Sequence, residues 1–98
     1  MNIQAMMKQA QKMQKDMLNA KEEIDNKTYE AKSGLVSIEM KGTKEITKVK
    51  IDADAIEKDE IEMLEDMILV AVNEANKKID KETEEKMGKY TKGMPGLF

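Results

Sequence analysis

The lysines of this chain are spaced so that several of them could bind one anionic partner. Lys8, Lys12 and Lys15 follow one another at i, i+4 and i+7, so on a helix they line one face. Gln11 lies beside them and adds a hydrogen-bond donor. A second group stands near the other end of the chain: Lys77, Lys78 and Lys81.

These lysine groups permit two interpretations. Lys side chains neutralise the phosphates of nucleic acids and release condensed counterions, while Gln donates to phosphate and sugar oxygens. Lys and Gln are also good helix formers on exposed faces. The pattern alone favours the plainer interpretation, a solvated helix face.

The residues that usually carry catalysis are scarce. The sequence has no Cys and no His, and all 17 of its cations are Lys, which excludes thiol nucleophiles, thiolate metal sites and the usual general base near neutral pH. Asp52, Asp54, Asp59 and Glu62 offer carboxylates for a hard cation, but no loop has EF-hand spacing with its Gly. We expect no enzyme, no cofactor, no metal site and no small-molecule substrate.

Charge is spread unevenly along the chain. Residues 51–66 carry eight acids and one Lys, a net −7, whereas residues 27–50 carry six Lys and three acids, a net +3. The acidic segment is typical of a solvent-exposed connection followed by a helix N-terminus, where carboxylates interact favourably with the helix dipole. A nucleic acid, if bound, must avoid it.

The apolar residues near the N-terminus predict a long helix over about residues 2–25. They recur at alternating steps of three and four, the a/d spacing of a heptad, with no Gly or Pro between them. This seam lies opposite the first lysine row. Its members are Ile3, Met6, Ala10, Met13, Met17, Ala20 and Ile24.

Alternating apolar and polar residues predict strands over about residues 27–32, 35–41 and 45–52. The connections are short, which favours an antiparallel meander. The faces expected to be half-buried are Tyr29 and Ala31, then Val36, Ile38 and Met40, then Thr47, Val49 and Ile51.

A second long helix is predicted over about residues 59–87. Asp59 and Glu62 have capping-box spacing at its start, and Gly88 or Gly93 is expected to stop it, leaving a tail over residues 88–98. In that tail Leu97 and Phe98 either fray or dock on an apolar surface. The helix seam comprises Leu64, Ile68, Ala71, Ala75 and Ile79.

Length and core composition predict a single domain over residues 1–98 that associates with a second copy. A helix of 28 residues spans about 42 Å, whereas a compact domain of this size has a radius of gyration of about 13 Å, so the helices should overhang the sheet. The core is lean, with ten Met, no Trp and one Phe, and lean cores on short chains often borrow a partner's surface. We expect a homodimer, with both seams as candidate packing surfaces.

No targeting or membrane segment is evident. No run approaches the roughly 18 apolar residues of a membrane span, and the Gln- and Met-rich start has no apolar segment with a small-residue cleavage site. We therefore expect a cytoplasmic protein that makes no membrane contact.

Three blocks of the sequence resemble the YbaB/EbfC family of nucleoid-associated proteins. The first is the Met-, Gln- and Lys-rich stretch MKQAQKMQ at residues 7–14. The second is GLVSIEMKGTKEITKVKID at residues 34–52, similar to the strand–Gly–strand core of that family. The third is LEDMI at residues 64–68, followed by Ala71, Asn73, Ala75, Lys78, Met87, Gly88 and the tail Thr91 to Phe98.

The resemblance implies an α+β protomer, helix–three-stranded antiparallel sheet–helix, in a homodimer whose projecting helices grip duplex DNA. It also implies a cytoplasmic, nucleoid-associated role, and it makes phosphate binding the favoured interpretation of the lysines. The implied DNA-binding residues are Lys8, Gln11, Lys12, Lys15, Lys77, Lys78 and Lys81. The alternative is a protein-interaction scaffold whose Met-rich helical arms adapt to varied partners.

Overall fold

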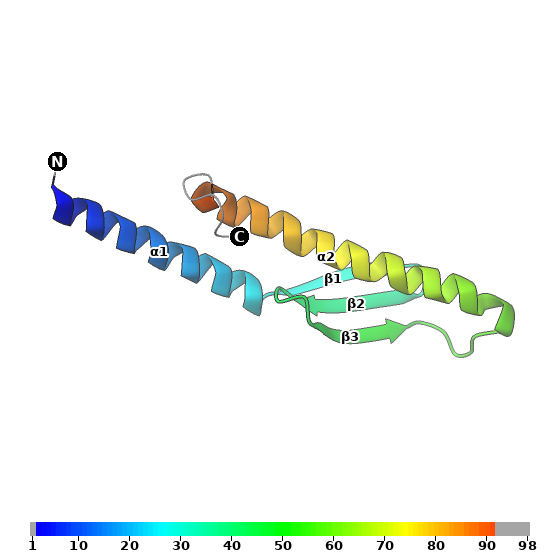
Figure 1. Cartoon of the computed structure of the whole chain (residues 1–98). Coiled ribbons are helices and arrows are strands. Elements are labelled where there is room, and N and C mark those ends of the chain that lie inside the picture. Colours follow the sequence, from blue (N-terminus) through cyan, green and yellow to red (C-terminus); the bar gives the residue numbers. More distant parts are fainter. Residues whose placement is uncertain (1, 92–98) are drawn as a thin grey trace.

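Two long helices and a small sheet make up the chain (Figure 1). The computed structural model describes residues 2–91, so the tail residues 92–98, with Leu97 and Phe98, lie outside the described part. The helix–three strands–helix arrangement confirms the predicted α+β class. The elements are α1 (Ile3–Asn26), β1 (Thr28–Ser33), β2 (Val36–Lys41), β3 (Ile46–Ile51), the short 3-10 turn η1 (Lys58–Glu60) and α2 (Ile61–Thr91).

The sheet is an antiparallel meander in the order β1-β2-β3. Gly34, with φ +56°, makes the turn between β1 and β2, where a positive φ favours glycine. A β-bulge interrupts the pairing of β2 with β3, because Glu39 faces Lys48 but Met40 faces Ile46. The predicted alternation in the third strand is therefore wrong at its start: Ile46, not Thr47, stands opposite the buried Met40.

The core lies between α2 and one face of β1 and β2. Val36, Ile38 and Met40 are fully buried on β2, and α2 meets them with Ala71 and Ala75, which have no exposed surface. Alanine at these positions lets the helix backbone approach the strands closely. Alternation along the strands thus buries one face and leaves the other to solvent.

Gly42 fastens the sheet to the end of α1. Its N–H donates to the carbonyl oxygen of Lys27 at 3.1 Å. A Cβ at this position would lie 1.8 Å from the carbonyl oxygen of Ile24, far inside van der Waals contact. Only glycine permits this approach, by which the buried Ile24 anchors α1 to the core.

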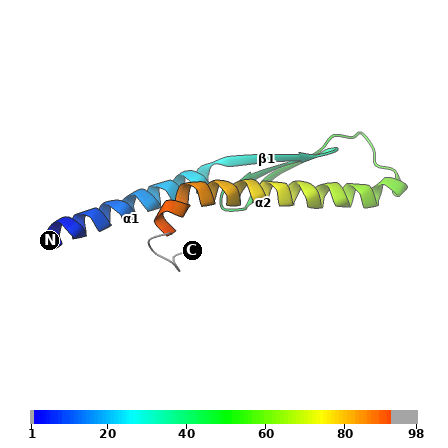
Figure 2. The same ribbon diagram turned by 90° about the horizontal axis from the view of Figure 1, so that it is seen from above.

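Beyond that anchor α1 projects away from the sheet (Figures 1 and 2). The molecule measures 71 × 20 × 14 Å with a radius of gyration of 19.4 Å, well above the 13 Å or so of a compact domain of this length. Met17 and Ala20 pack partly on the core. The seam residues nearer the N-terminus are exposed: Ile3, Met6, Ala10 and Met13.

The ends of α2 differ from the prediction. Asp59 lies inside the turn η1, so the predicted capping box does not start the helix, which begins at Ile61. At the other end the helix continues through Gly88 to Thr91, so residues 88–91 are not tail. The buried Met87 and the half-buried Tyr90 pack on the core, and this burial outweighs the cost of about 1 kcal/mol for Gly inside a helix.

Candidate nucleic-acid interface

The first lysine row lies on the free part of α1. Lys8, Lys12 and Lys15 are all exposed, as is Gln11. Helical spacing places them opposite the side that carries Ile24 onto the core. None of the three ammonium groups forms an ion pair with another residue in the range 2–91. The row is therefore open to an external anion.

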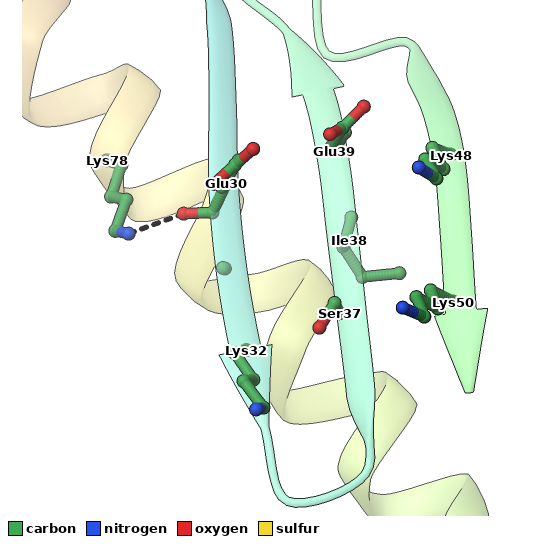
Figure 3. Close-up of a pocket in the computed structure, with 9 residues that line it drawn as sticks. Glu30, Lys32, Ser37, Ile38, Glu39, Lys48, Lys50 and Lys78 are labelled. Carbon is green, nitrogen blue, oxygen red and sulfur yellow. Dashed lines mark hydrogen bonds between the residues drawn. The ribbon is translucent and has the colours of Figure 1, made fainter. Parts of the chain in front are cut away.

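The lysines of α2 do not form one surface. Lys77 pairs with Glu74 at 3.7 Å, and Lys81 is exposed. Lys78 leans toward the sheet, where its Nζ donates to the carbonyl oxygen of Glu30 on the edge strand β1 (Figure 3). Consecutive helix positions point about 100° apart, which separates Lys77 from Lys78 despite their adjacency in sequence.

The two predicted groups also lie apart along the molecule. Ile24 of α1 and Ile79 of α2 line the same hollow, so the α2 lysines stand level with the end of α1. At 1.5 Å per residue, Lys15 lies about 13 Å and Lys8 about 24 Å farther along the α1 axis. Within one protomer the structure does not bring the two groups together.

Glu82 of α2 is the centre of a polar cluster where β1 and the end of α1 meet α2. The hydroxyl of Tyr29 on β1 donates to its carboxylate, and Lys27 donates to the same carboxylate at 2.9 Å. Lys86 lies 3.4 Å from Glu82 and 3.6 Å from Glu23 on α1. One carboxylate on α2 thus joins the first strand and, through Lys86, the first helix.

This cluster changes the acidity of its members. The hydrogen bond from Tyr29, followed by that from Lys27, lowers the pKa of Glu82 from 4.5 to about 2. Burial, followed by the hydrogen bond to Glu82, raises the pKa of Tyr29. Glu82 is therefore an anion, and Tyr29 a neutral donor, throughout the physiological range.

Sequence reasoning missed a third lysine group, on the open face of the sheet. Lys32, Lys48 and Lys50 stand on the side of the strands away from α2, beside a hollow of about 410 Å³ (Figure 3). The signal was present in the alternation of Lys with apolar residues along β3 and in the net positive charge of residues 27–50. These lysines form one group only because of the order of the strands in the sheet, and the spacing of residues within one strand does not reveal that order.

The described range was tested for clustered metal ligands and for helices that could cross a membrane. Residues 2–91 contain no group of three or more acidic side chains placed to hold a metal ion. Neither helix, over its described length, is long and apolar enough to cross a membrane.

The chain is thus a small α+β protein with exposed lysines on a projecting helix. The sequence model of the YbaB/EbfC DNA-binding family matches residues 1–94. The chain belongs to this family, which is a family of nucleoid-associated DNA-binding proteins and not of enzymes.

Curated relatives match over nearly their whole length. A nucleoid-associated protein of Lactococcus lactis subsp. cremoris is 47% identical, covering 97% of this chain and 98% of the relative. One of Enterococcus faecalis is 45% identical, covering 98% and 94%. One of Ligilactobacillus salivarius is 43% identical, covering 99% and 95%.

A solved structure supports the fold. The crystal structure of an uncharacterized protein from Helicobacter pylori superposes with a TM-score of 0.70, covering 87% of this chain and 91% of the other, at 21% identity. At that identity the similarity shows a shared fold and nothing about function.

Proposed function

We propose that this protein is a homodimer that binds duplex DNA through its Lys-rich projecting helices, mostly by phosphate and shape contacts. It acts at the nucleoid, in the cytoplasm, in nucleoid organisation or gene regulation. Membership of a DNA-binding family and the names of its relatives, nucleoid-associated proteins, support the ligand and the location.

The observation that carries the proposal is the charge on the free part of α1. Residues 3–15 contain three lysines and no acid, and Lys8, Lys12 and Lys15 have no ion-pair partner in the described chain. Each lysine that meets a phosphate releases counterions, which gives affinity without sequence information. Because the chain lacks Arg, the rigid bidentate contact of a guanidinium group to guanine is unavailable to it.

The proposal predicts that charge on α1, and not the lysine side chain as such, determines duplex affinity. The variant K8E/K12E/K15E should lose binding to unrelated duplexes in a gel-shift titration, because three attractive phosphate contacts become repulsive. The matched variant K8R/K12R/K15R keeps the charge and should bind like the unchanged protein.

Circular dichroism and sedimentation should show that both variants keep their helices and their oligomeric state. Undiminished duplex affinity in a folded K8E/K12E/K15E variant would remove α1 from the proposed interface.

The inner face of β3 supports association with a second copy. Ile46, Val49 and Ile51 share the side on which β2 is buried, yet they are 44%, 52% and 39% exposed, because α2 covers only β1 and β2. Three large apolar side chains in a row on an edge strand form an exposed apolar patch, a feature that marks interaction sites. A second copy related by a two-fold axis covers such a face with an identical one.

The Met-rich arm supports a second candidate function, the gripping of another protein. Met6, Met7 and Met13 are 52%, 57% and 39% exposed on α1, and thioether side chains adapt to differently shaped partners. Co-purification of a defined protein partner that survives nuclease treatment, and that is lost in M6Q/M13Q, would favour this candidate over duplex DNA.

A further inference from the structure

The open face of the sheet carries a positively charged row that crosses all three strands. Strand register places Lys32 opposite Ser37, and Ser37 opposite Lys50. Side chains at these positions alternate with the buried ones and therefore point away from α2. Figure 3 shows the row in front of the helix, with Lys48 two residues along β3.

No acid belongs to this row. The neighbouring row contains Glu30, Glu39 and Lys48, so the carboxylates gather on one half of the face. Lys32, Lys48 and Lys50 form no ion pair with any residue between 2 and 91.

The strand positions of the three lysines concentrate positive charge on this part of the sheet. Strands lie about 4.8 Å apart, so the backbones of Lys32 and Lys50 are about 10 Å apart, and those of Lys48 and Lys50 about 7 Å. The three lysines line a hollow of about 410 Å³ together with Lys78, and Glu30 and Glu39 line its other half, so the net positive charge lies toward the row Lys32–Ser37–Lys50. An anion in the hollow would relieve the mutual repulsion of the lysines and would find the hydroxyl of Ser37 as a hydrogen-bond donor.

We infer that the row Lys32–Ser37–Lys50, with Lys48 beside it, is a second phosphate-binding surface, which takes phosphate groups of the nucleic-acid backbone. This inference rests on the proposed duplex binding and adds a contact that the helices do not supply. Lys78 closes the β1 edge of the same face, since its ammonium group reaches the carbonyl oxygen of Glu30. Lys78 is thereby assigned to the sheet surface and not to the helix row.

The competing explanation is protection of exposed strand edges. β1 and β3 are the two edges of the sheet within the protomer, and lysine on an edge strand discourages pairing with other chains. That role requires no ligand. It predicts that neutral substitutions promote aggregation and leave phosphate binding unchanged.

The test compares K32Q/K50Q with two controls in the full chain. K32R/K50R keeps the charge on the row, whereas K44Q/K58Q removes two lysine charges outside the row and outside the α1 group. Duplex affinity is measured at several salt concentrations, and inorganic triphosphate binding is measured by calorimetry.

We expect the plot of log affinity against log salt concentration to become shallower in K32Q/K50Q, by roughly 0.9 for each phosphate that the variant no longer neutralises. Both controls should match the unchanged protein. If slope, duplex affinity and triphosphate binding are all unchanged in K32Q/K50Q, the inference is overturned and edge protection is left as the role of the row.

The other outcomes are equally decisive. If triphosphate binding is lost while the duplex slope stays the same, the row serves a free phosphate compound and the assignment to the nucleic-acid backbone is wrong. If the unchanged protein binds no duplex at all, the proposed function itself fails and the inference falls with it.

Discussion

Glu82 shows how one side chain of α2 links the first strand and, through Lys86, the first helix. Its carboxylate accepts hydrogen bonds from Tyr29 and Lys27 and lies close to Lys86, which also reaches Glu23 of α1. The side chain of Glu82 is only 17% exposed. Hydrogen bonds to such a shielded charged group are worth more than surface ion pairs.

Substitution E82Q should therefore destabilise the protein. Loss of the charge weakens the bonds from Tyr29 and Lys27 together, at a cost of about 1–3 kcal/mol, and each kcal/mol lowers Tm by roughly 4–8 °C in a domain of this size. Thermal unfolding followed by circular dichroism at pH 7 measures the change, with E84Q as the exposed neighbouring control. An unaltered Tm in E82Q would show that the cluster contributes nothing to stability.

The same pair of proteins gives a pH dependence with a defined sign. The pKa of Glu82 falls from 4.5 to about 2 on folding, so its contribution is complete above pH 4.5 and is lost as the pH drops toward 2. The Tm difference between the unchanged protein and E82Q should thus shrink between pH 5 and pH 3. A difference that stays constant over this range would contradict the lowered pKa.

At the scale of elements, periodicity alone predicted most of the fold. The heptad spacing that begins at Ile3 and the alternation around Ile38 placed the first helix and the central strand to within about one residue. Features that depend on contacts between distant segments were not predictable. The β-bulge beside Met40 and the passage of α2 through Gly88 both depend on packing against other elements.

Gly42 and Gly88 should respond oppositely to substitution by alanine. In G42A the new Cβ meets the carbonyl oxygen of Ile24, and backbone cannot yield as a side chain can, so we expect a loss of more than about 2 kcal/mol. In G88A the Cβ meets no atom within 4 Å, and removal of a helical glycine should add about 0.5–1 kcal/mol. Urea denaturation of both variants measures the two effects, and destabilisation of similar size in each would contradict this account of Gly42.

For the whole molecule, the sequence predicted which residues are exposed better than it predicted which of them share a surface. Lys8, Lys12 and Lys15 are exposed on one arm, as the spacing indicated. The family resemblance groups Lys78 with Lys77 and Lys81 on the second helix, whereas in the structure the Lys78 ammonium group reaches the edge of β1. On α2 the seam residue Ala71 is fully buried, and the half-buried Leu64 and Ile68 pack against the core of the same protomer.

The exposed β3 face makes a prediction about assembly. In V49D a charge enters the centre of the proposed dimer interface, and because Val49 is 52% exposed in the protomer, the fold should tolerate the change. Sedimentation equilibrium should show a dimer for the unchanged protein and a monomer for V49D. The control T47D places the same charge on the bulge residue of the strand and should remain dimeric; a dimeric V49D would place the interface elsewhere.

The salt dependence of duplex affinity tests the central claim most directly. A dimer that uses Lys8, Lys12 and Lys15 of both protomers neutralises about six phosphates, so log affinity should fall with log salt concentration at a slope near −5. Any further phosphate contacts would make the slope steeper. A titration of unrelated duplexes at two or more salt concentrations should give this steep slope with little dependence on sequence, and a flat response would contradict binding through the lysines of the projecting helices.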